Sequence, residues 1–283
     1  MNTQTLFNTA LAAIAGCLIT APLANKARAQ TMTPCPAASG YANEGTWGTS
    51  VGSCAGTPSV YGITVMKMGL CTADPGPTVG GTPDFTKCSL TFDGSETVSF
   101  AAGGAVSLSK GERPENGTYT HAVLLFEKTF KIQAEYGPLA NGNTWYSTTT
   151  YQRPSTTGPA ATFEAPLNTF GLDTSPKTCK TTSSVSSSSG TMTGYILDSS
   201  LNLIADDSSA TTCTGATYLL GTVRLNTPVL ITESTKECKA NFTVTNNGTT
   251  IYYQSNGTEG CTNAQGCIAH DSGPFDIQFT VIE

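Results

Sequence analysis

The stretch PENGTYTHAVLLFEKTFKIQ, residues 114–133, is the most apolar run that follows the first thirty residues. Successive side chains of a β-strand point to opposite faces. One face would carry Ala122, Leu124, Phe126 and Phe130, and the other would carry Tyr119, His121, Val123 and Leu125. Because both faces are apolar from Ala122 to Phe126, the stretch predicts a central strand that is covered on both sides. We interpret His121, at the edge of this zone, as a structural side chain hydrogen-bonded to backbone or to a neighbouring hydroxyl.

The rest of the chain repeats this β pattern. Thr, Val, Ile, Tyr and Phe dominate alternating runs, as expected of half-buried strands, at 61–70, 97–108, 194–204, 216–225, 241–254 and 273–283. Asn247-Gly248 favours a tight turn and predicts a hairpin within 241–254. No segment sustains the i, i+3, i+4, i+7 apolar repeat of a helix. The sequence therefore predicts an all-β fold, a disulfide-stabilised antiparallel β-sandwich.

The element Gly117-Thr118-Tyr119-Thr120 resembles the G-x-Y strand start of prealbumin-like β-sandwich domains found in bacterial surface proteins. In those domains the glycine ends a turn and the tyrosine begins a core strand, which matches Gly117 and Tyr119. The resemblance is confined to this short element, and it implies a sandwich module rather than a catalyst.

Residues 1–29 have the pattern of an export signal. An apolar run from Ala10 to Leu23 is followed by Ala27-Arg28-Ala29, a small-x-small cleavage signature. Pro22 interrupts the run, which is shorter than the about 20 apolar residues needed to cross a membrane. Cleavage after Ala29 would place residues 30–283 in a secreted, periplasmic or cell-surface location.

A second interpretation of this region is lipid anchoring, because Ile14-Ala15-Gly16-Cys17 resembles a bacterial lipobox in which Cys17 would be lipidated. Apolar character continues past Cys17, which favours soluble export. Both interpretations place the protein outside the cytoplasm, and no later apolar run is long enough to span a membrane.

The charge balance argues against polyanionic partners. The chain has 14 Lys and Arg residues against 20 Asp and Glu, for a formal net charge of −6, and it contains no basic cluster. Affinity for nucleic acid depends on Lys and Arg contacts with phosphates. Nucleic acid and anionic membrane surfaces are therefore disfavoured as partners.

The chain has ten cysteines, and Cys17 lies in the predicted signal. In an exported protein the remaining nine predict a disulfide framework, although spacing does not fix its connectivity. Pairing of neighbours favours Cys35–Cys54, Cys71–Cys88, Cys213–Cys238 and Cys261–Cys267. This leaves Cys179 as the odd cysteine, either free or bonded to another chain. No C-x-x-C pair or histidine lies at a zinc-ligand spacing, so disulfides are favoured over a metal–thiolate site.

Residues 174–193 hold mostly Ser and Thr, a composition that predicts a linker or a long exposed loop. The region 30–283 is then either one continuous sandwich, which we favour, or two β-domains that cover 30–173 and 194–283.

No catalytic group and no cofactor site is predicted. His270-Asp271-Ser272 holds the residue types of a nucleophilic triad, but neighbours along a strand point to opposite faces, so we interpret this stretch as a turn. Asp198, Asp206 and Asp207 cluster in sequence and leave a calcium-binding loop open as an alternative, with solvated turn acids favoured.

Aromatic residues provide the remaining candidate site. Trp47, Trp145 and Tyr146 lie in polar, Gly-rich surroundings and would form a ligand platform or cap the ends of the sandwich. The first function hypothesis is an exported, non-enzymatic structural or adhesive cell-surface protein whose partner is itself, as an oligomer or filament, or surface glycans and proteins. The alternative is a secreted carbohydrate-binding module or a polysaccharide-acting hydrolase.

Overall fold

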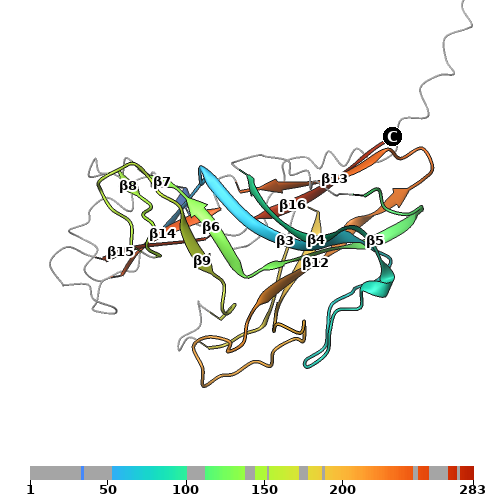
Figure 1. Cartoon of the computed structure of the whole chain (residues 1–283), viewed down its shortest axis with the longest axis horizontal. Coiled ribbons are helices and arrows are strands. Elements are labelled where there is room, and N and C mark those ends of the chain that lie inside the picture. The colour runs from blue at the N-terminus through green and yellow to red at the C-terminus, as the bar shows by residue number, and fades with distance from the viewer. Residues whose placement is uncertain are drawn as a thin grey trace, which may run out of the picture.

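The computed structural model describes residues 33–34, 53–100, 112–137, 144–151, 153–171, 178–186, 189–244, 248–254, 267–272 and 275–283. These residues form sixteen β-strands and one short 3-10 helix, η1 (Phe85–Lys87). No helix among them is long and apolar enough to cross a membrane. The predicted all-β, disulfide-stabilised class is confirmed (Figure 1).

Eight strands form the main sheet, and all their pairings are antiparallel. The order is β10-β11-β12-β5-β3-β6-β9, with β4 paired along the remaining edge of β3. The strands are β3 (Val60–Cys71), β4 (Cys88–Phe100), β5 (Gly117–Glu127), β6 (Thr129–Gln133), β9 (Phe163–Pro166), β10 (Thr182–Ser186), β11 (Gly190–Leu197) and β12 (Tyr218–Ile231).

Strands β5 and β6 together form the centre of this sheet, because both pair with the same edge of β3. At Lys128 the outer neighbour changes from β12 to β9. The Lys128 N–H donates to the Thr217 carbonyl, and the Leu167 N–H donates to the Lys128 carbonyl. The stretch 114–133 is thus the central strand that the sequence predicts.

Both faces of β5 are covered, as predicted: the residues from Ala122 to Phe126 are between 1 and 5% exposed. One face carries Leu124 and Phe126, which belong to the largest core cluster. The opposite face carries Val123 and Leu125, which pack in a second cluster with residues of two long loops. Hydrophobic burial on both faces gives this strand its central position.

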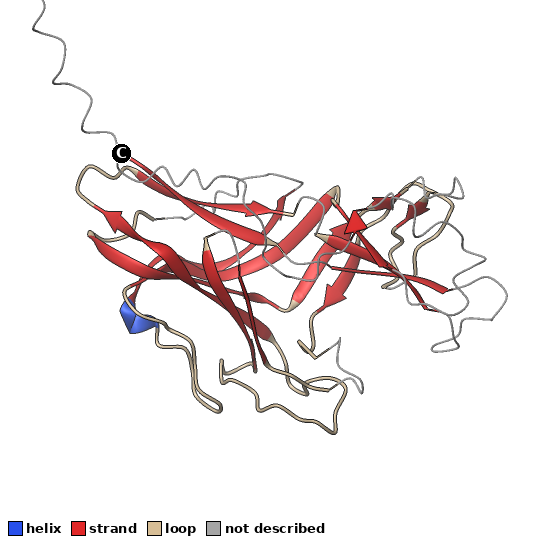
Figure 2. Cartoon of the chain, turned by 180° about the vertical axis from the view of Figure 1, so that it is seen from behind, coloured by secondary structure: helices blue, strands red, loops and turns tan. Residues whose placement is uncertain are grey.

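The first face of the sheet is covered by a ribbon of β13 (Glu237–Thr243) and β16 (Asp276–Ile282), which pair antiparallel. Phe242 of β13 and Phe275, just before β16, pack into the core cluster of Leu124 and Phe126. Figures 1 and 2 show the ribbon running alongside the central strands, so the sheet and the ribbon are the two layers of the sandwich.

The remaining strands form two smaller sheets. One has the order β1-β2-β14-β15, in which β1 (Thr33–Pro34) and β2 (Ser53–Gly56) are parallel and β14 (Thr249–Gln254) and β15 (Cys267–Ser272) are antiparallel. The other is the pair β7 (Glu135–Tyr136) and β8 (Trp145–Tyr146).

Two sequence predictions about connections are wrong. Residues 241–254 do not form a hairpin, because β13 pairs with β16 whereas β14 pairs with β2 and β15. The chain changes sheet between these strands, with the Gly248 N–H donating to the Val244 carbonyl. The Ser/Thr-rich segment 174–193 is not only a loop, since it contains β10 and the start of β11. Strands on either side of this segment, β5 and β12, pair in one sheet.

His270 connects the small sheet to the main one. It lies in β15, is fully buried, and stacks on Phe163 of β9 with ring centroids 3.8 Å apart and an interplanar angle of 11°. Its Nε2 lies 3.3 Å from the Thr150 carbonyl, and its Nδ1 has no hydrogen-bond partner among the described residues. Burial lowers the pKa of His270 from 6.5 to about 4.

We expect this histidine to make the fold sensitive to acid. The unfolded chain binds a proton at His270 as the pH falls below 6.5, while the folded chain resists protonation until about pH 4. The free energy of unfolding should therefore fall by roughly 3 kcal/mol between these pH values. Urea denaturation across this range measures the slope.

The matched control uses the other histidine of the chain. His270→Phe should flatten the slope between pH 6.5 and 4, whereas His121→Gln should keep it. An unchanged slope in His270→Phe would contradict the assignment.

Candidate functional site: two disulfide-braced loops

Two long loops cover the Val123 and Leu125 face of the main sheet. The first, the 72–87 loop, joins β3 to β4, and the second, the 198–217 loop, joins β11 to β12. Phe85 of the first loop and Leu203 of the second pack in the same cluster as Leu125. Figure 1 shows both loops projecting on the side of the sheet away from the β13–β16 ribbon. Loops held on a rigid scaffold are common sites of binding.

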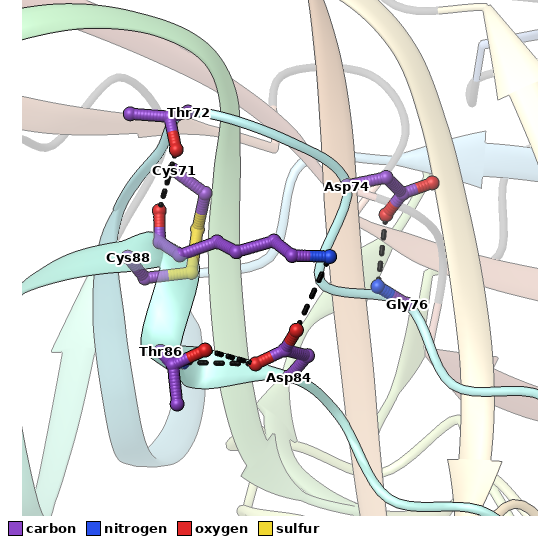
Figure 3. A network of polar contacts seen from close by, with 8 residues as sticks. Cys71, Thr72, Asp74, Gly76, Asp84, Thr86 and Cys88 are labelled. Atoms are coloured by element: carbon purple, nitrogen blue, oxygen red, sulfur yellow. Dashed lines mark hydrogen bonds and ion pairs between the residues drawn. A yellow bond between two sulfur atoms is a disulfide. The ribbon is translucent and has the colours of Figure 1, made fainter.

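The base of the 72–87 loop is closed by the disulfide Cys71–Cys88, as predicted. The two residues are partners in the β3–β4 ladder, with Cα atoms 3.9 Å apart. One step beyond the disulfide the Thr72 N–H donates to the Lys87 carbonyl at 2.9 Å. The Thr72 hydroxyl donates to the same carbonyl at 3.2 Å (Figure 3). Cys71 is fully buried, so the loop is bonded to the core itself.

Aspartates fix the path of this loop (Figure 3). The Asp74 carboxylate accepts from the Gly76 N–H at 2.9 Å, and Asp84 accepts from the N–H of Thr86 at 3.2 Å. Asp84 also pairs with the Lys87 Nζ at 3.1 Å. Hydrogen bonds from Thr86 hold the pKa of the Asp84 carboxyl below its usual value.

Gly76 packs directly on Tyr195 of β11. A Cβ at position 76 would lie 2.4 Å from the Tyr195 hydroxyl oxygen, so a larger residue there would have to displace the Tyr195 ring. Burial, with a smaller contribution from the Asp74 charge, raises the pKa of Tyr195. The backbone of the loop at Gly76 thus packs directly against β11.

The second disulfide joins Cys179 to Cys213, with Cα atoms 4.8 Å apart. The predicted pair Cys213–Cys238 and the predicted odd cysteine at Cys179 are therefore wrong. The return of the chain as β10 brings Cys179 beside the 198–217 loop, where its N–H donates to the Asp207 carbonyl and the Asp207 N–H donates back. Cys238 lies in β13, half-buried against the cluster of Tyr119 and Val229.

The other cysteine predictions stay predictions. Cys17, Cys35 and Cys261 lie outside the described residues, and Cys54 and Cys267 are described only as backbone in β2 and β15. The pairs Cys35–Cys54 and Cys261–Cys267 are therefore not tested.

The three aspartates of the calcium alternative have separate hydrogen-bond partners, two within their own turns and one in the segment before β10. Asp198 accepts from the N–H groups of Ser200 and Asn202, Asp206 accepts from the N–H and hydroxyl of Thr181, and Asp207 accepts from Ser209. These hydrogen bonds lower the pKa of all three carboxyls, mainly through Asn202, Thr181 and Ser209 respectively. No group of three or more His, Cys, Asp or Glu that could hold a metal ion occurs in the described part of the chain.

The middle of the 72–87 loop is hydrogen-bonded to the start of the 198–217 loop, beside the end of β11. The Gly80 N–H donates to the Leu203 carbonyl, and the Leu203 N–H donates to the Gly81 carbonyl, both at 2.9 Å. Leu203 is buried, whereas Val79 beside it is 67% exposed. We call the residues 79–81 and 201–203 the loop tip.

The backbone of the loop tip is unusual. Gly80 has a φ of 74°, and Leu201 has a φ of 65°, the only positive φ of a non-glycine residue in the described ranges. A leucine rarely adopts this conformation, and such strain persists only where surrounding contacts impose it. Here those contacts are the hydrogen bond from the Leu201 N–H to the Asp198 carbonyl and the packing of Leu201 on the second cluster.

The predicted aromatic platform is only partly described. Trp47 lies outside the described residues, while Trp145 and Tyr146 are adjacent in β8 and both half-buried. Adjacent strand residues point to opposite faces. Trp145 and Tyr146 therefore do not share one flat surface.

The two histidines contact a hydroxyl and an aromatic ring of the fold, and the triad-like stretch 270–272 lies in a strand. The His121 Nδ1 lies 2.9 Å from the Thr120 hydroxyl, a neighbouring hydroxyl as predicted. His270 is buried on Phe163. His270-Asp271-Ser272 is a strand rather than the predicted turn, because β15 continues through Ser272.

The loop tip was not predicted from the sequence. A signal was present, because DPGPTVGGTPDF between Cys71 and Cys88 concentrates Pro and Gly in a loop closed by two cysteines. No local sequence pattern predicts that this loop pairs with residue 203.

Comparisons with protein-family models, curated proteins and solved structures found no match to this chain. The resemblance of residues 117–120 to prealbumin-like domains stays a prediction. Functional inference therefore rests on the fold and on the geometry of its loops.

We expect removal of the first disulfide to loosen the 72–87 loop. Replacing Cys71 and Cys88 together by alanine should lower the free energy of unfolding by about 3 kcal/mol, the usual value for a closed loop of this size. Urea denaturation measures the loss, and trypsin should cleave faster at the exposed Lys87.

The matched control removes the other disulfide. Replacing Cys179 and Cys213 by alanine should destabilise the protein without faster cleavage at Lys87. Equal cleavage in both double variants would show that the loops are not braced independently at their bases.

Proposed function

We propose that the chain is an exported, non-enzymatic structural or adhesive protein of the cell surface, and that it makes contact through the loop tip. The observation that carries this proposal is the backbone pairing of two disulfide-anchored loops, Gly80 and Gly81 with Leu203, beside which Val79 is 67% exposed. Self-assembly into a filament is one way in which such a protein would act.

Rigidity is the physical basis of the proposal. Binding by a flexible loop loses free energy because the loop must be ordered, and a pre-organised loop avoids most of that loss. The 72–87 loop is closed at its base by Cys71–Cys88, and the 198–217 loop is bonded through Cys213 to Cys179. Backbone hydrogen bonds then join the two loops at the loop tip. An apolar side chain presented on such a frame gains from burial against a partner.

Composition supports a location outside the cytoplasm. Disulfides form and persist in oxidising compartments, and residues 1–29 have the pattern of an export signal. Only 12% of the residues are charged, which suits a surface that makes contact through apolar and hydroxyl groups rather than through ion pairs.

A charge placed at the loop tip should weaken adhesion. Val79→Asp is expected to reduce the retention of protein-coated beads on a layer of the same protein, or on a mucin layer, by about tenfold, because an unpaired carboxylate would be desolvated in the contact. Retention under flow measures the effect, and light scattering of the unreduced protein reports its assembly state.

Thr82→Asp is the matched control, since Thr82 is exposed in the same loop but lies outside the tip. It should retain beads like the wild type, and both variants should keep the wild-type melting temperature. Equal retention of Val79→Asp and the wild type would rule out the loop tip as the contact surface.

The alternative function, a carbohydrate-binding module or polysaccharide hydrolase, would use the half-buried Trp145. Our proposal expects that Trp145→Ala does not change bead retention. Glycan-array binding by the wild type that is lost in Trp145→Ala would instead favour the alternative.

A further inference from the structure

A cavity of roughly 300 Å³ lies between the main sheet and the β13–β16 layer. Its floor is the sheet face that carries Met68, Leu124 and Met192, from β3, β5 and β11. Phe242 and Phe275 line it from the opposite layer. The cavity thus lies on the other face of the sheet from the loop tip.

One glycine leaves this space open, and its partner in the ladder packs against an aromatic ring of the lining. Gly194 and Gly221 are direct partners in the β11–β12 ladder, and both line the cavity. A Cβ at Gly221 would meet nothing closer than the Leu124 carbonyl oxygen at 3.9 Å, so a side chain there would enter empty space. At Gly194 a Cβ would lie 2.8 Å from a ring carbon of Phe170, another lining residue.

This arrangement is unusual for a central sheet. Strand interiors favour β-branched and aromatic residues, and a glycine there often marks a site that a ligand approaches closely. Protein interiors are otherwise packed as densely as organic crystals, with few voids larger than a water molecule. Gly221, which faces an open volume from the middle of the sheet, therefore indicates space kept for an occupant.

The lining defines the chemistry of that occupant. Ser183, Ser272 and Tyr61 are the lining residues whose side chains carry a polar atom, and none of the lining residues is charged. A charged ligand would lose its hydration without gaining a partner. Met68 and Met192 supply flexible side chains that adapt to a ligand's shape.

We propose that this cavity binds one neutral, largely hydrocarbon small molecule, such as a medium-chain alcohol. An apolar cavity of about 150 Å³ is enough to bind benzene, and small-molecule sites begin at about 300 Å³. The site is independent of the loop tip, since the two lie on opposite faces of β5, so either proposal can fail without the other.

The test uses N-phenyl-1-naphthylamine, a neutral probe that fluoresces in apolar surroundings, with the full exported chain. The wild type should bind one probe per chain in a saturable manner, and dodecan-1-ol should displace it. Gly221→Ile places a strand-favouring side chain in the cavity and should weaken probe binding at least about tenfold while the melting temperature holds or rises.

Thr191→Ile is the matched control, because it adds the same side chain at an exposed position of the neighbouring strand β11. It should bind the probe like the wild type. If Gly221→Ile does not fold, Gly221→Ala decides the question: weaker binding supports the site, and unchanged binding overturns it. Absence of saturable binding in the wild type, or equal affinity in Gly221→Ile, also overturns the proposal.

Discussion

The double pairing of β5 is the constraint on which the rest of the structure depends. Its backbone groups bond to β3 on one edge and to β12 on the other, so no polar main-chain group needs water along the middle of the strand. Both of its faces can then be apolar, and Leu124 and Leu125 are 3% and 2% exposed on opposite sides. The β13–β16 ribbon covers one of these faces, and the two long loops cover the other.

The two faces of β5 are covered by different means. The Leu124 face is covered by another β layer, whose aromatic side chains meet the sheet around an open volume. The Leu125 face is covered by loops, which have no ladder of their own. They are held instead by disulfides, one across the base of the 72–87 loop and one that ties Cys213 of the 198–217 loop to Cys179. A loop layer contributes less regular hydrogen bonding than a strand layer, so covalent closure offsets the entropy of its many residues.

Local pattern was enough to predict the centre of the fold. The alternation at 61–70 and the two-sided apolar run at Ala122–Phe126 identify their strands because the faces of a strand follow directly from a period of two. Cys71–Cys88 was predictable for a related reason: its residues flank one loop, and the ladder of β3 and β4 brings them together.

The rest depends on which strands pair, and local pattern does not contain that information. Asn247-Gly248 is a good turn sequence, but its flanking strands pair elsewhere, β13 with β16 and β14 with β2 and β15. Cys179 meets Cys213 across 34 residues only because β10 joins the sheet. The cavity at Gly194 and Gly221 likewise exists only once β11 and β12 are in register.

Strand β10 shows how a sequence typical of a linker takes a place in a sheet. Its Ser and Thr side chains have little apolar area to bury, but an edge strand needs only one paired side, and Ser184 reaches the Thr193 hydroxyl across the β11 ladder at 2.9 Å. Its alternate residues Ser183 and Val185 face the cavity. The cavity thus reaches from β5, which is paired on both edges, to a polar strand that is paired on one edge only.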